Sequence, residues 1–127
     1  MRLSIALHEA LANAICHGNL EVGSVLWRAG NGASRAHRLI EERLHTAPYA
    51  DRRVHLAAQV TPQEATYVVR DEGPGFDPGI LSDPTDHANL VKISGRGLFF
   101  IRMFMDEVFH DETGNTITMI KRRSKTA

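Results

Sequence analysis

The amino-acid sequence predicts an α+β two-layer sandwich, in which a mostly antiparallel sheet packs on helices. Two helical patterns open the chain, two strand patterns joined by a short polar link follow, and a helix and two further strands close it. Short links favour antiparallel neighbours, because parallel strands need a long crossover connection. The length of 127 residues suggests a single domain, residues 1–127.

The first predicted helix covers residues 3–17. Its apolar residues Leu3, Leu7, Leu11 and Ala14 recur at spacings of three and four, which is the period of one helix face. Gly18-Asn19 follows as a stop signal, because glycine and asparagine tolerate the backbone conformations that end helices. An amphipathic helix is therefore expected at the start of the chain.

The remaining elements alternate with turn signals. Further helices are predicted over residues 34–46 and 97–105, and strands over 54–60, 65–70, 108–110 and 116–121. Residues 72–94 are rich in Gly, Pro, Asp and Ser and show little periodicity. A loop of this length in a compact domain is usually functional or disordered.

Charge and composition exclude several classes of function. Fifteen Lys and Arg balance fifteen Asp and Glu, which argues against a broad electrostatic grip on nucleic acid. The basic ending at residues 121–125 reads as a solvated tail. Cys16 is the single cysteine and no apolar run approaches a membrane span, so we expect a cytoplasmic protein without disulfides or membrane partners.

Polar residues form a stripe along the first predicted helix. Glu9, Asn13 and His17 are spaced by four, so they share one face, away from the leucines. The amide oxygen of Asn13 suits Mg²⁺ that already carries phosphate charge, and Glu9 can accept a proton from a nucleophile. Taken alone, the stripe is better explained as a solvated helix face.

A second motif follows the predicted strand 65–70. Asp71 stands at the strand end, where its carboxylate can accept a hydrogen bond from the exocyclic amine of adenine. Gly73 and Gly75, before Phe76, let the backbone approach a ring without a Cβ clash. An ordinary turn would use the same residue types.

A third motif opens the predicted helix 97–105. Ser94, Gly95, Arg96, Gly97 and Leu98 stand at its start, where free backbone N–H groups attract phosphate. The glycine spacing of P-loop and Rossmann sites is missing, so neither of those sites is expected.

In this order and spacing, the three motifs resemble the N box and the two glycine boxes of the GHKL (Bergerat-fold) ATPase superfamily, over nearly the whole chain. Gly95 to Leu98, residues 104–108 and residues 114–117 look most like the anti-sigma-factor serine kinases. The resemblance implies ATP and Mg²⁺ as cofactors, with Glu9 as general base and Asn13 as the metal ligand.

The same resemblance implies roles for the other motif residues. Asp71 would read adenine over the glycines, residues 77–94 would form the ATP lid, and Ser94 to Leu98 would face the phosphates. Lys92 would reach the phosphates from the lid, and His17 either lies near the phosphates or caps its helix. The notable departure is Asn115, because the family usually has Thr after the late glycine of the last hairpin.

Two further departures concern the architecture. Only about two helical turns precede Glu9, where the family normally has a strand, a helix and a strand. The chain is therefore expected to be a fragment or to complete its sheet with another chain, and an open sheet edge favours a homodimer. Residues 21–51 are longer than usual and form a candidate insert for partner binding.

The resemblance implies a serine/threonine protein kinase that phosphorylates a small regulatory protein of the anti-anti-sigma kind, with a sigma factor as a further candidate partner. Two alternatives stay open on the sequence. One is a binding module that uses ATP only to set partner affinity, and the other is the catalytic domain of a histidine kinase.

Overall fold

The computed structural model of the chain describes residues 2–22, 32–75 and 97–123. The helices are α1 Arg2–Asn13, the π-helix η1 Ala14–Asn19, α3 Gly32–Arg43, the 3-10 helix η2 Tyr49–Asp51 and α5 Gly97–Phe104. The strands are β1 His55–Val60, β2 Glu64–Arg70, β3 Glu107–His110 and β4 Thr116–Arg122. All predicted elements are present, with boundaries shifted by at most three residues.

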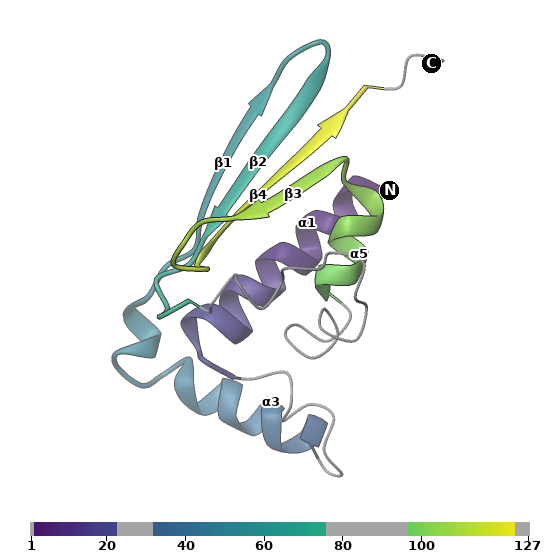
Figure 1. Cartoon of the computed structure of the whole chain (residues 1–127). Helices are drawn as coiled ribbons and strands as arrows, with labels where there is room; N and C mark the ends of the chain where they lie inside the picture. The colour runs from purple at the N-terminus through teal and green to yellow at the C-terminus, as the bar shows by residue number, and fades with distance from the viewer. Residues whose placement is uncertain (1, 23–31, 76–96, 124–127) are drawn as a thin grey trace.

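The four strands form one sheet in the order β1-β2-β4-β3, and every neighbouring pair is antiparallel. Strands β1 and β2 make one hairpin and β3 and β4 another, while β2 and β4 join the two hairpins at the centre of the sheet. Helices α1 and α5 lie against one face of the sheet (Figure 1). The predicted α+β two-layer sandwich is confirmed.

The main core lies between this sheet face and the two helices. Its buried residues are Ala6, Ala10, Ala14, Val69, Leu98, Ile101, Met105 and Met119. Leu3, Leu7 and Leu11 pack against its margin, so the predicted apolar side of the first helix is confirmed, but these leucines do not occupy the centre of the core. The small alanines face the core instead, because they let the α1 backbone approach α5 and the sheet closely.

The first predicted helix, residues 3–17, ends two residues later than expected, because the helical path continues as η1 to Asn19. The N–H of Leu20 donates to the carbonyl of Ile15 at 3.0 Å, which is the wider i→i+5 bond of a π-turn. Gly18 serves close packing: a Cβ at this position would lie 2.3 Å from the carboxylate carbon of Asp71. Such π-turns often occur at functional sites.

Beyond the end of η1, helix α3 covers a second and smaller cluster (Figure 1). Its buried residues are Leu20, Val22 and Ala36, with Leu39, Ile40 and Tyr49 packed against them. Within the described ranges, no helix is both long and apolar enough to cross a membrane.

Candidate functional site

A cavity of about 210 Å³ lies between the helices and the sheet. Its walls come from α1 and η1, the end of β2, the start of α5 and the hairpin of β3 and β4. The lining residues are Ala10, Asn13, Ala14, His17, Gly18, Val69, Asp71, Gly75, Leu98, Ile101, His110, Gly114, Asn115, Thr116 and Ile117. Asn13, Asp71 and Leu98, one from each sequence motif, therefore face the same space.

The start of α5 lies against the polar stripe of α1. A Cβ built on Gly97 would lie 2.9 Å from Nδ2 and 3.1 Å from Oδ1 of Asn13, and 3.0 Å from Oε2 of Glu9. A side chain at Gly97 would therefore displace the amide and the carboxylate. The glycine brings the first N–H groups of α5 next to two oxygen-bearing side chains, which is an arrangement suited to phosphate and a hard cation.

Asp71 follows β2 directly and is 7% exposed. Its N–H donates to the carbonyl of Asn115 at 2.9 Å, which ties the strand end to the neighbouring hairpin. Its Oδ1 accepts from the N–H of Gly73 at 2.9 Å, and the carboxylate lies over Gly18. One carboxylate oxygen is thus held by the protein, while Asp71 still lines the cavity.

Two titratable groups of the cavity have shifted pKa values. Burial raises the pKa of Asp71, although the Gly73 N–H and the charge of Arg52 act to lower it. Burial, reinforced by the charge of Arg102, lowers the pKa of His110 to about 4. His110 is therefore a neutral imidazole near pH 7, and the cavity is lined by a polar but uncharged ring as well as by its buried acid.

The two glycines after Asp71 are required by packing within the chain. A Cβ on Gly73 would lie 2.1 Å from the carbonyl oxygen of Gly18. Gly75 has a φ of +77°, and a Cβ there would lie 2.0 Å from the carbonyl oxygen of Thr113. Any side chain at these positions would push the turn off η1 and the β3–β4 hairpin. Gly75 also lines the cavity, whereas Gly73 is not among its lining residues, and the role of both glycines beneath a base stays a prediction.

His17 and Asn115 both line the cavity. A ring nitrogen of His17, Nδ1, contacts the carbonyl oxygen of Val22, so the ring also helps to hold the chain after η1. The side-chain oxygen of Asn115 accepts from the hydroxyl of Thr116 at 3.2 Å. The threonine expected after the late glycine thus stands one position later and still faces the cavity.

Several predicted residues lie outside the described ranges, namely Phe76, Lys92, Ser94, Gly95, Arg96 and the lid 77–94. Sequence reasoning missed His110, Thr116 and the apolar wall formed by Val69, Ile101 and Ile117. The displaced Gly-Asn-Thr order is a signal for Thr116. His110 has no such signal, because only the pairing of β3 with β4 brings it to the cavity.

Within the described part of the chain, no three His, Cys, Asp or Glu side chains are grouped to hold a metal ion by themselves. Asn13 and Glu9 offer one amide and one carboxylate oxygen close together. Such a sparse oxygen set suits a cation that is bound mainly by phosphate and water, as Mg²⁺ commonly is.

The fold and the cavity define a two-layer α+β domain with a partly open cavity between sheet and helices. The family model of the histidine kinase-like ATPase domain matches residues 1–121 of the chain. The chain therefore belongs to this family, and it is an ATP-binding module of the GHKL type. A search of curated proteins returned no significant match.

Proposed function

We propose that this domain is a Mg-ATP-dependent serine/threonine protein kinase of the anti-sigma-factor type, which phosphorylates a small regulatory protein. The observation that carries the proposal is the meeting of three distant segments around one cavity. Asn13 of α1, Asp71 after β2 and Leu98 at the start of α5 all line it. The acceptor type rests on the resemblance of residues 95–98, 104–108 and 114–117 to the anti-sigma-factor kinases.

Adenine is assigned to the end of the cavity that holds Asp71. Val69, Ile101 and Ile117 provide apolar contact for a flat ring, and Asp71 is the buried carboxylate among the cavity-lining residues. A buried acceptor left without a donor is costly, so a purine with an amine at position 6 is favoured over one with a carbonyl at that position. This wall therefore favours adenine over guanine or hypoxanthine.

The phosphates are assigned to the end of the cavity at which α5 begins. The N–H groups of this helix start face Asn13 and Glu9 across Gly97. Asn13 would hold Mg²⁺ through its amide oxygen, and the cation would neutralise charge on the phosphates. The cavity thus separates a base-reading end from a charge-holding end, as a nucleotide requires.

In the proposed reaction the hydroxyl oxygen of the acceptor serine or threonine forms a bond to the γ-phosphorus of ATP. The bond from this phosphorus to the bridging β,γ oxygen breaks, and ADP leaves with that electron pair. Glu9 accepts the hydroxyl proton, and the α5 N–H groups stabilise charge on the transferred group. The side chain of Glu9 lies one helical turn from Asn13, next to Gly97.

Calorimetry with ATP, ADP, GTP and inosine triphosphate, with and without Mg²⁺, tests the site. We expect the Asp71→Asn change to weaken ATP binding about 10- to 100-fold, because a charge-assisted hydrogen bond is lost. The Asn13→Ala change should weaken binding chiefly when Mg²⁺ is present. The Glu112→Gln change neutralises an exposed acid of the β3–β4 turn. It should leave the affinity for ATP unchanged, both with and without Mg²⁺. Equal affinity of Asp71→Asn and the unmodified chain for ATP would refute the base assignment.

Phosphoryl transfer is tested separately, with radiolabelled ATP and a panel of small regulatory proteins that carry candidate serine or threonine acceptors. The Glu9→Gln variant should bind ATP normally but transfer phosphate at least about 100-fold more slowly, since a positioned base contributes this order of rate. Glu41→Gln, which neutralises an exposed acid of α3, is the matched control. Full partner regulation by a non-hydrolysable ATP analogue would favour the binding module instead.

A further inference from the structure

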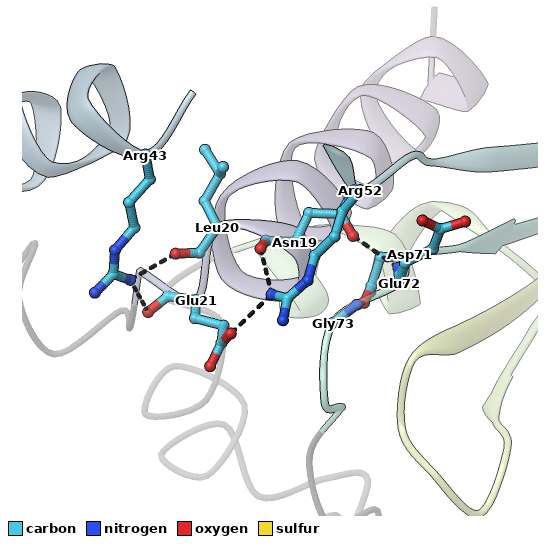
Figure 2. A network of polar contacts seen from close by, with 8 residues as sticks. All are labelled: Asn19, Leu20, Glu21, Arg43, Arg52, Asp71, Glu72 and Gly73. Atoms are coloured by element: carbon cyan, nitrogen blue, oxygen red, sulfur yellow. Dashed lines mark hydrogen bonds and ion pairs between the residues drawn. The ribbon is translucent and has the colours of Figure 1, made fainter. Parts of the chain in front are cut away.

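A polar network joins the chain segment around α3 and η2 to the turn that carries Asp71 (Figure 2). We propose that Arg52 and Asn19 are positioning residues for purine selectivity: Arg52 holds Asn19, and Asn19 holds the Asp71–Gly73 turn at the base-reading end of the cavity. The inference rests on the proposed function, because it takes Asp71 as the group that reads the base.

Asn19 makes the contact with the turn itself. Its Oδ1 accepts from the N–H of Glu72 at 2.7 Å, and the residue is 5% exposed. The bond joins residues 53 positions apart in the sequence and fixes the backbone immediately after Asp71. Because Asn19 is the last residue of η1, its side chain connects the end of this helix to the end of β2.

Arg52 in turn holds the backbone of Asn19. Its Nη1 donates to the carbonyl of Asn19 at 2.7 Å and to Oε2 of Glu21 at 2.7 Å. The guanidinium also lies over the ring of Tyr49, 5.3 Å from the ring centroid. Figure 2 shows Arg52 between Glu21 and Asn19, with the Asp71 turn on the far side of Asn19.

A second arginine holds the same stretch from α3. Nη1 of Arg43 donates to the carbonyls of Leu20 at 2.6 Å and Glu21 at 3.0 Å, and its guanidinium lies 4.6 Å from the Tyr49 ring centroid. Glu21 has a φ of +54°, which is uncommon for a residue with a side chain. Two arginines thus maintain an otherwise unfavourable bend directly after η1.

Other contacts hold the Asp71–Gly73 turn without involving Arg52. The Glu72 carboxylate accepts from the N–H of Arg53 at 3.0 Å and pairs with His55 Nε2 at 2.8 Å. The N–H of Asp71 is bonded to Asn115. Removal of Arg52 is therefore expected to let the turn shift while the strand and the fold persist.

A small shift of the turn should change base discrimination, because the Asp71 carboxylate lies in a confined place. The atoms of Asp71 are so close to Gly18 that a single added Cβ would overlap them. Hydrogen-bond strength falls steeply with misalignment, and a binding group must be held within about 0.5 Å to discriminate between ligands. The charge of Arg52 also acts on Asp71, where it opposes the effect of burial on the carboxyl pKa.

The test compares affinity for ATP with affinity for inosine triphosphate, which has a carbonyl in place of the adenine amine. Both are measured by calorimetry on the full chain carrying Arg52→Ala, Arg52→Lys or Asn19→Ala. Arg38→Ala, at an exposed arginine of α3, is the matched control. We expect Arg52→Ala and Asn19→Ala to reduce the ATP preference about five- to tenfold. Arg52→Lys should recover part of it, and Arg38→Ala should retain it fully.

A general loosening of the fold would weaken the binding of both nucleotides alike and leave the ratio of their affinities unchanged. An unchanged ratio in Arg52→Ala and Asn19→Ala therefore overturns the inference. If either alanine variant fails to fold, Arg52→Lys and Arg52→Gln are compared: equal ratios in both and in the unmodified chain also overturn it. No ATP preference in the unmodified chain would instead refute the assignment of Asp71, and with it the proposed site.

Discussion

The two hydrophobic clusters of this domain differ in how they are held together. The cluster between the sheet and helices α1 and α5 is closed by apolar packing, with Ile101 and Met119 fully buried. The cluster beneath α3 has only Leu20, Val22 and Ala36 as buried members, and arginine contacts to backbone carbonyls surround it. Residues of the first cluster line the cavity, whereas the region of the second cluster is connected to the Asp71 turn by hydrogen bonds of Arg52 and Asn19.

Because of this difference, substitutions in the two regions should have different effects on stability. Apolar packing is lost in proportion to the volume removed and responds weakly to charge. A segment held mainly by hydrogen bonds at the surface opens at lower cost, since water can replace many of the bonds. We therefore expect changes in the first cluster to affect the whole fold, and changes near α3 to act locally and on the cavity edge.

The largest effect is expected for Ile101→Ala, which leaves a void between α5 and the sheet. The side chain is fully buried, so the free energy of unfolding should fall by about 2–5 kcal/mol. Urea unfolding followed by circular dichroism measures it. Met103→Ala, on the exposed side of the same helix, is the control and should cost less than about 0.5 kcal/mol. Similar losses for the two variants would contradict this description of the core.

A somewhat smaller effect is expected from pH, through His110 at the inner wall of the cavity. Its pKa is lowered from 6.5 to about 4, so between these values the unfolded chain binds more protons than the folded one. Stability should therefore fall as the pH falls through this window, by about 3 kcal/mol in total. Asp71, whose pKa is raised, acts in the opposite sense, because its contribution is lost as the pH rises through its folded pKa.

The variant His110→Gln isolates this contribution. Unfolding measured at several pH values between 4 and 7 should show a flatter loss of stability toward acid in this variant than in the unmodified chain. His45→Gln removes a histidine whose side chain is 77% exposed, and it should keep the original slope. Parallel curves for His110→Gln and the unmodified chain would show that this imidazole does not titrate as inferred.

The smallest effect is expected for Arg43→Ala, which removes the two hydrogen bonds from α3 to the carbonyls of Leu20 and Glu21. A loss of about 1–2 kcal/mol is expected, and it should be local. Hydrogen exchange followed by mass spectrometry should accelerate in residues 32–43 and stay unchanged in residues 97–104. The exposed Arg35 of α3 provides the control, as Arg35→Ala. Uniform acceleration would mean that the two clusters unfold as one unit.

Periodicity and turn signals were sufficient to predict the α-helices and strands of the described residues, because each of these elements carries its own local pattern, whereas the short 3-10 helix Tyr49–Asp51 was not predicted. The amphipathic pattern of α1 was predicted from Leu3, Leu7 and Leu11, which pack at the margin of the core, whereas Ala6 and Ala10 lie at its centre. Local pattern identifies an apolar side, whereas the closeness of a neighbouring helix decides which part of that side is innermost. The helix extends two residues beyond its predicted end at residue 17. Gly18 lies within it because only a residue without a Cβ fits against the Asp71 carboxylate.

By itself, the sequence determined the order of the elements, the two-layer class and the three motifs that contain Asn13, Asp71 and Gly97, because these depend on residue type and short spacing. Tertiary structure alone decided that Asn13 and Asp71 share one cavity with Leu98, the neighbour of Gly97, that His110 joins its wall and that Arg52 supports the turn after Asp71 through Asn19. Contacts between residues 53 positions apart arise from strand pairing and helix packing, and no local pattern encodes them.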